Sequence, residues 1–147
     1  MALRKIMVML FSAIVLCTSL VATTSAETMY PPVDEGITPA YEIASNPYSN
    51  LEISGQTAYC TSKTGSANAI SITVEQTLEK YSGWFWIWSD VKDAHWTETV
   101  NANTIRVDNT KGELSDGTYR LKSVFTLTDS NGKTEIITIY SVEKKVG

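Results

Sequence analysis

Apolar and polar residues alternate along two long segments of the chain, and a period of two predicts β-strands with one buried face. In 69–79 the apolar positions are Ile70, Ile72, Val74 and Leu78, with Gln76 as the polar exception on the same face. In 118–128 they are Tyr119, Leu121, Phe125 and Leu127. Each segment is therefore expected to turn one face towards a core.

A hairpin is predicted at the end of the second segment, where 129–133 contains the pair Asn131-Gly132. Asn-Gly fits a two-residue hairpin turn, and 135–143 would return as the next strand. With Asn131 and Gly132 as the whole loop, the register is fixed. The expected pairs are Ser130 with Lys133, Leu127 with Ile136, Val124 with Ile139, Ser123 with Tyr140, Leu121 with Val142, and Arg120 with Glu143.

Shorter β segments fill the rest of the chain, at 51–61, 84–92, 95–100 and 104–108. About seven strands with frequent turn signals and no helical period predict an all-β, immunoglobulin-like antiparallel β-sandwich. The segment 115–121 is similar to the tyrosine corner of such domains, with Tyr119 as the corner residue. Trp88, with Trp86 as second choice, is expected to be the buried tryptophan of the core.

The N-terminus predicts export. Arg4 and Lys5 precede an apolar run at 7–21, and the small residues of 24–26 suit cleavage before Glu27. The expected organisation is a signal peptide at 1–26, a leader at 27–50 that contains all four prolines, and the sandwich at 51–147. Tyrosines at 30, 41 and 48 leave open whether the leader folds onto the domain.

The two cysteines support the same interpretation. Cys17 would leave with the signal peptide, so Cys60 would be the one thiol of the mature chain and no internal disulfide could form. Val15 and Leu16 precede Cys17, where lipoprotein processing needs a small residue. We therefore expect a secreted protein with no stable membrane association after cleavage, and Cys60 as a buried apolar residue.

Charge narrows the choice of partners. The whole chain has a net charge of −4, and loss of Arg4 and Lys5 would leave 10 basic residues against 16 acidic ones, or −6. Nucleic acids and anionic membranes attract basic surfaces, so neither is expected as a partner. An unknown protein or a glycan is expected instead.

The chain resembles a family of small secreted immunoglobulin-like β-sandwich proteins of Gram-positive, mostly anaerobic, bacteria. The resemblance covers roughly 51–142 and rests on segments 53–60, 77–80, 88–91, 117–121, 132–135 and 140–141. The extra aromatic residues at 84–86 depart from the family's pattern. The family has no assigned activity, so the resemblance implies fold and export and leaves the function open.

The run Trp84-Phe85-Trp86-Ile87-Trp88 is the main candidate for a binding site. If it is a strand, Trp84, Trp86 and Trp88 share one face, and Phe85 and Ile87 share the other. The tryptophan face could be a glycan platform or part of the core. In the second case Phe85 and Ile87 would join Val124, Ile137 and Ile139 in an outer apolar patch, covered by a partner or by the leader.

Catalytic and metal-binding residues are scarce. His95 is the single histidine, with Asp90, Asp93 and Glu98 near it in sequence, and nothing positions a nucleophile beside it. One histidine and one mature cysteine make no zinc set, and 129–135 has the wrong spacing for calcium. No enzyme activity, metal or cofactor is expected; a small hydrolase using His95 and Asp93 is a distant alternative.

Overall fold

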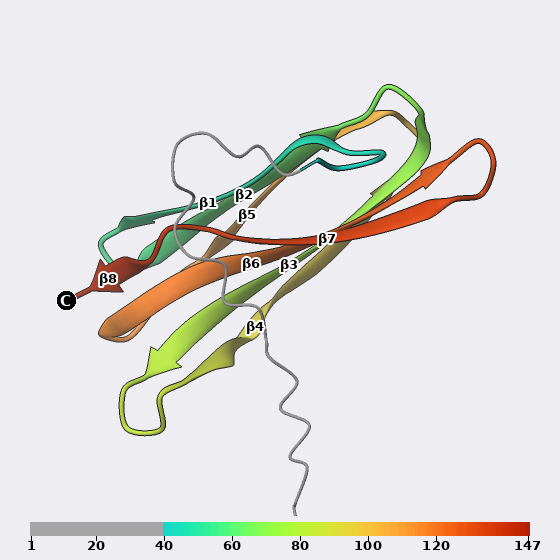
Figure 1. Ribbon diagram of the computed structural model, residues 1–147. Helices are drawn as coiled ribbons and strands as arrows, with labels where there is room; N and C mark the ends of the chain where they lie inside the picture. The colour runs from blue at the N-terminus through green and yellow to red at the C-terminus, as the bar shows by residue number, and fades with distance from the viewer. Residues whose placement is uncertain (1–39) are drawn as a thin grey trace, which may run out of the picture. The chain divides into compact units, whose positions relative to one another are not determined.

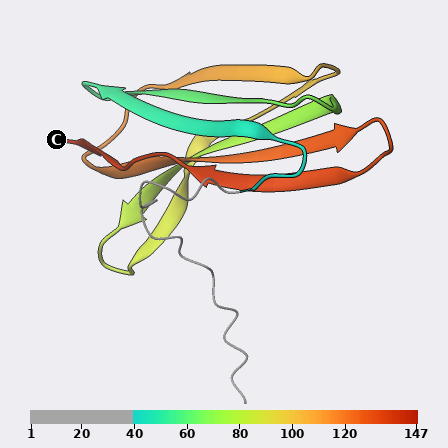
Figure 2. The ribbon, with the colours of Figure 1, turned by 45° about the horizontal axis from the view of Figure 1, so that its top comes forward.

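Two antiparallel sheets pack face to face in the computed structural model, which describes residues 40–147 (Figures 1 and 2). The strands are β1 (Ser45–Ser54), β2 (Thr57–Gly65), β3 (Ala69–Ser82), β4 (Ile87–Val100), β5 (Thr104–Lys111), β6 (Gly117–Asp129), β7 (Thr134–Tyr140) and the short β8 (Lys144–Val146). One sheet has the order β1-β2-β5, and the other has β4-β3-β6-β7 with β8 beside β6. The predicted immunoglobulin-like β-sandwich is confirmed, with one short strand more than the seven expected.

The alternation in β3 and β6 was interpreted correctly. The side chains of Ile72, Val74 and Leu78 in β3, and of Leu121 and Phe125 in β6, are fully buried between the sheets. Ile70 is the exception and is 54% exposed. The pairing of β3 with β6 shifts between Ala69 and Ser71, so the alternation does not extend to that end of the strand.

Two strand predictions need correction. The predicted strand 51–61 is a hairpin of β1 and β2, which turns at Gly55 with φ of 58°. The predicted strands 84–92 and 95–100 are one strand, β4, interrupted by a bulge opposite Leu78. The first strand begins at Ser45, so the last residues that the sequence assigned to the leader belong to the sandwich.

The β6–β7 hairpin has a different register from the predicted one. Phe125 pairs with Ile137 and Val124 with Thr138, one residue away from the expected partners. The loop contains three residues because the amide of Asp129 donates to the carbonyl of Lys133, and Gly132 takes the left-handed conformation with φ of 80°. A slip of one residue exchanges the two faces of the returning strand, so Ile137 is buried and Ile136 is 68% exposed.

The tyrosine corner is confirmed. The Tyr119 hydroxyl donates to the Ser115 carbonyl at 2.6 Å, four residues upstream, and the side chain is 1% exposed. Tyr119 stands at the start of β6, where it fixes the connection from β5 against the core.

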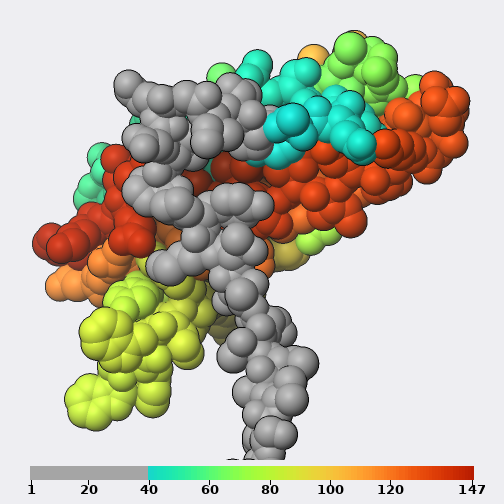
Figure 3. Space-filling model, in the orientation of Figure 1, coloured from blue at the N-terminus to red at the C-terminus, as the bar shows by residue number. Residues whose placement is uncertain are grey.

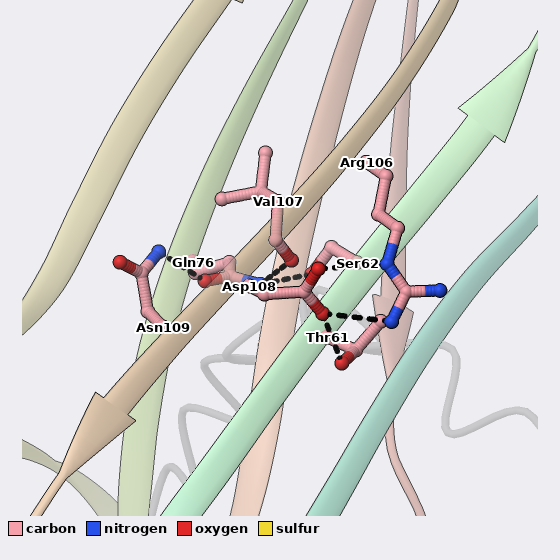
Figure 4. A network of polar contacts seen from close by, with 7 residues as sticks. All are labelled: Thr61, Ser62, Gln76, Arg106, Val107, Asp108 and Asn109. Carbon is pink, nitrogen blue, oxygen red and sulfur yellow. Dashed lines mark hydrogen bonds and ion pairs between the residues drawn. The ribbon is translucent and has the colours of Figure 1, made fainter.

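A chain of polar side chains, which we call the polar seam, crosses the core between the sheets. Asn109 Nδ2 donates to Gln76 Oε1 at 2.8 Å, and Gln76 Nε2 donates to Ser62 Oγ at 2.7 Å (Figure 4). The hydroxyls of Ser62 and Ser49 both contact Ser123 Oγ, at 2.6 and 2.8 Å. The seam lies between two apolar clusters, one with Phe125 and Ile72, the other with Leu121 and Tyr119. In residues 40–147 no buried side-chain nitrogen or oxygen lacks a partner.

The carboxylate of Glu135 in β7 binds the backbone of the segment before β1. Glu135 accepts hydrogen bonds from the amides of Glu42, Ile43 and Ala44 at 2.8–2.9 Å. Burial by itself would raise the pKa of Glu135, but these amides and the ammonium of Lys133 hold it below its ordinary value. Residues 40–44 are thus folded onto the domain; residues 1–39, with the predicted signal peptide and most of the leader, lie outside the described residues.

Candidate functional site: an aromatic hairpin tip

The turn between β3 and β4 carries three consecutive exposed aromatic residues, which we call the aromatic tip. Trp84, Phe85 and Trp86 are 86%, 67% and 81% exposed. The amides of Phe85 and Trp86 donate to the Ser82 carbonyl at 3.2 and 2.9 Å, which closes the turn before Ile87. Figure 2 shows this hairpin diverging from the three-stranded sheet, and in Figure 3 its yellow-green side chains project from the lower left.

The prediction that Trp88 or Trp86 fills the core is wrong. Residues 83–86 form the turn, so the alternation assumed for 84–88 does not apply. Trp88 is half-buried in β4 and pairs with Tyr81 of β3, with ring centroids 5.2 Å apart. The tryptophan that packs against the core is Trp96, which pairs with Gln76 and contacts the cluster of Leu78 and Leu121.

An arginine stiffens the base of this hairpin. The Arg120 guanidinium lies 4.2 Å from the centre of the Trp88 ring and 4.1 Å from that of Tyr140. Its Nε donates to the carboxylate of Glu79 at 2.6 Å, and this carboxylate is nearly buried. The predicted pairing of Arg120 with Glu143 is therefore wrong. Stacked, charge-assisted contacts of this kind hold the emerging strands in place below the tip.

The backbone of Trp86 is in an uncommon conformation. Its φ is 58°, in the left-handed region that glycine and asparagine occupy readily and that bulky residues rarely adopt. The side chain is exposed, so packing against the domain does not compensate for this strain. Strained residues that folding does not need are frequent at functional sites.

At the base of the β3–β4 hairpin lies an open hollow of about 460 Å³. It is bounded by the last residues of β3, the first residues of β4 and the connection from β5 to β6. Its polar lining includes Lys80, Ser82, Ser89, Lys111 and Glu113, and its apolar lining includes Leu114 and Tyr119. This volume is in the range of small-molecule sites in proteins.

The outer apolar patch expected from the sequence does not form. Ile137 and Ile139 face the other sheet, where Ile137 is buried and Ile139 packs against the core cluster of Phe125. Val124 is half-buried and pairs with Thr138, and Phe85 and Ile87 belong to the hairpin end. The structure thus keeps Trp84, Phe85, Trp86 and Ile87 together and separates them from Val124 and Ile139.

The remaining reactive groups show no catalytic arrangement in residues 40–147. His95 is exposed, and its Nδ1 lies 2.8 Å from the hydroxyl of Thr77. No group of three or more histidine, cysteine or acidic side chains in these residues could hold a metal ion. Cys60 is 1% exposed, and burial raises the pKa of its thiol to about 12, which confirms it as an unreactive core residue. No helix in this part of the chain is long and apolar enough to cross a membrane.

One sequence signal could have located the turn. Ser82-Gly83 is a common turn dipeptide and directly precedes Trp84. Given more weight than the apolar run that follows it, this pair would have ended the third strand before Trp84. The hollow has no such signal, because Lys111 and Glu113 reach it from a different part of the chain.

Comparisons with known proteins add little to this site. No model of a known protein family and no curated protein matches the chain. Among solved structures, the chain is similar to the CARDB domain of a Pyrococcus furiosus protein, determined in complex with di-metal ions. The match covers 76% of this chain and 97% of that one, at 13% identity and a TM-score of 0.34. So distant a likeness does not bear on ligand or activity.

Proposed function

We propose that the protein is an exported, non-enzymatic binding module that contacts its partner through the aromatic tip, Trp84, Phe85 and Trp86. The observation that carries the proposal is the exposure of three consecutive aromatic side chains at the end of a braced hairpin. Large aromatic residues contribute most of the affinity at many interfaces, because they bury much apolar area with few rotatable bonds.

Export is the part of the proposal that rests on sequence alone, on the signal peptide predicted at 1–26. The bacterial family that the chain resembles would place it outside the cell as well. The net charge of −4 disfavours nucleic acid as the partner, which leaves a protein or a glycan.

A binding experiment with matched variants tests the tip. The mature chain is applied to immobilised polysaccharides and to purified surface proteins, and bound protein is measured. The double variant Trp84→Ala, Trp86→Gly should lose binding by about tenfold or more, because two aromatic anchors are removed. Tyr59→Ala serves as the control, since Tyr59 is 47% exposed on the other sheet. Retention of every interaction by the double variant would contradict the proposed role of the tip.

A further inference from the structure

Backbone strain occurs in the lining of the hollow and in the adjoining turn of the aromatic tip. Four non-glycine residues among 40–147 have positive φ: Asn46, Asp93, Trp86 and Glu113. Asparagine and aspartate tolerate this conformation, whereas tryptophan and glutamate do so less readily. Glu113, with φ of 59°, lines the hollow, and Trp86 is in the turn that follows Ser82 at its edge. Of the two residues least suited to their backbone conformation, one therefore lines the hollow and the other lies in the turn that connects two of its bounding strands.

Several polar side chains of the hollow have no partner within the described residues. No hydrogen bond or ion pair in 40–147 engages the hydroxyls of Ser82 and Ser89, the ammonium of Lys111 or the carboxylate of Glu113. Together they offer donors and acceptors in one concave surface. This differs from the polar seam, in which each side chain bonds to at least one other.

The floor of the hollow is, in contrast, firmly held. Tyr119 and Leu114 are buried, and the Tyr119 hydroxyl donates to the Ser115 carbonyl. Lys80 Nζ donates to Ser115 Oγ at 2.7 Å and lies 5.5 Å from the centre of the Tyr119 ring. A fixed floor below unpaired polar groups is the arrangement of a pre-formed ligand site.

We infer that the hollow and the aromatic tip form one site for a neutral saccharide. In this site one sugar ring stacks on the indole of Trp84, the most exposed residue of the tip, and the hydroxyls of the next ring bond to Glu113, Lys111 and Ser89. The inference deepens the proposed function and depends on it for the role of the tip.

The chemistry of the lining favours this class of ligand. A pyranose ring has a face of C–H groups that packs on an aromatic ring, and hydroxyls that both donate and accept at its rim. Lys80 and Lys111 are balanced in the lining by Glu113 and Asp90, so the hollow has no excess of either charge. An anionic or cationic ligand would gain little from such a lining, whereas a polyol can use both its unpaired donors and its unpaired acceptors.

The test measures binding of defined oligosaccharides to the mature chain. Cello-, xylo-, manno- and chito-oligosaccharides are titrated by calorimetry and by tryptophan fluorescence. We expect saturable binding of at least one series with a blue shift of the emission, because a bound sugar removes water from the exposed indoles. Trp84→Ala and Glu113→Gly should each weaken binding by about tenfold or more.

Two controls keep this test specific. Glycine accepts the backbone conformation of residue 113, so Glu113→Gly should remain folded, with a melting temperature at or near that of the wild type. Tyr48→Ala and Glu98→Gln change an exposed aromatic in β1 and an exposed acid in β4 that do not line the hollow, and both should bind within about twofold of the wild type.

The outcomes separate this inference from the proposed function. Loss of binding in Trp84→Ala with full affinity in Glu113→Gly would restrict the site to the tip and overturn the inference alone. Loss in Glu113→Gly with full affinity in Trp84→Ala would contradict the role of the tip and, with it, the inference of a joint site. Absence of saturable binding of any series up to about 20 mM, beyond the range of weak single sites, would overturn the saccharide assignment. Binding of the tip to a purified protein or to phosphatidylcholine vesicles would then identify the partner as a protein or a lipid surface.

Discussion

The two hairpins of the five-stranded sheet place very different residues at the same backbone conformation. Each turn contains one residue in the left-handed conformation, Gly132 between β6 and β7 and Trp86 between β3 and β4. Glycine adopts this conformation without steric penalty, whereas for an L-residue with a large side chain it costs about 1–2 kcal/mol. The first turn therefore suits folding, and the second retains an exposed indole at the expense of stability.

Polar groups differ between the two hairpins in the same way. In the β6–β7 turn, Asp129 Oδ1 accepts from the amides of Asn131 and Lys133 at 2.8 and 2.9 Å. Nearby, Glu135 holds the segment before β1, and Lys133 pairs with Glu42 at 2.6 Å. At the end of the β3–β4 hairpin the hydroxyls of Ser82 and Ser89 have no such partner among residues 40–147. A hairpin whose side chains are used within the fold is structural; one whose side chains are left available is suited to binding.

The largest effect is expected from matched phenylalanine substitutions. Phe125→Ala in β6 removes a fully buried ring and should lower the free energy of unfolding by about 3–5 kcal/mol. Phe85→Ala removes a ring that is 67% exposed and should change it by less than about 0.5 kcal/mol. Urea denaturation followed by circular dichroism measures both. Similar losses in the two variants would show that the tip packs against the domain.

Replacing the carboxylate of Glu135 should have the next largest effect on the free energy of unfolding. Glu135→Gln weakens three hydrogen bonds from amides to a charged acceptor and should lower the free energy of unfolding by about 2 kcal/mol at neutral pH. Because the pKa of Glu135 is lower in the folded chain, its contribution is full above the ordinary glutamate value of 4.5 and is lost as pH falls below it.

The pH series supplies the control for this prediction. The difference between wild type and Glu135→Gln, measured by urea denaturation, should shrink on acidification. Glu143→Gln alters an exposed carboxylate outside any ion pair of residues 40–147 and should follow the wild type throughout. A constant difference across the series would mean that the charge of Glu135 is not what holds residues 42–44.

Substitutions at the two left-handed positions should change stability by smaller amounts, and in opposite directions. Gly132→Ala places a Cβ at φ of 80° and should destabilise the fold by about 1 kcal/mol. Trp86→Gly relieves the strain at φ of 58°, while its flexible unfolded state offsets part of the gain, so stability should be unchanged or higher by up to about 1 kcal/mol. Thermal denaturation of both variants is the measurement. A marked loss of stability in Trp86→Gly would mean that the indole has a structural role.

The contrast between the hairpins also explains which parts of the fold could be predicted. Tyr119, Leu121 and Phe125 alternate with polar residues, so the pattern alone identified the buried face of β6. The register of β7 could not be predicted in this way. Asn131-Gly132 suits a two-residue loop, but the side chain of Asp129 bonds to two turn amides and favours a loop of three residues.

The candidate site was predictable only in part. The aromatic residues of 84–86 were identified by composition, but a strand was assumed where the chain turns, so their exposure did not follow from the sequence. The predicted register of β7 differs from the observed one by one residue, and for this reason Ile139 was expected on the outer face of the sheet. Lys111 and Glu113 approach Ser89 only through packing of the β5–β6 connection against β4, which no local pattern encodes.

The smallest change in the free energy of unfolding is expected for a substitution at the exposed end of the hairpin. Trp84 is 86% exposed, so Trp84→Ala should leave the free energy of unfolding within about 0.5 kcal/mol of the wild type. Trp88→Ala, at the base of the same hairpin, removes the ring between Tyr81 and the Arg120 guanidinium and should cost about 1–2 kcal/mol. Iodide quenching of fluorescence gives an independent measure, because the accessible part of the emission should fall in Trp84→Ala and rise as a proportion of the total in Trp88→Ala. Equal stability of the two variants would contradict a hairpin that is rigid at its base and free at its tip.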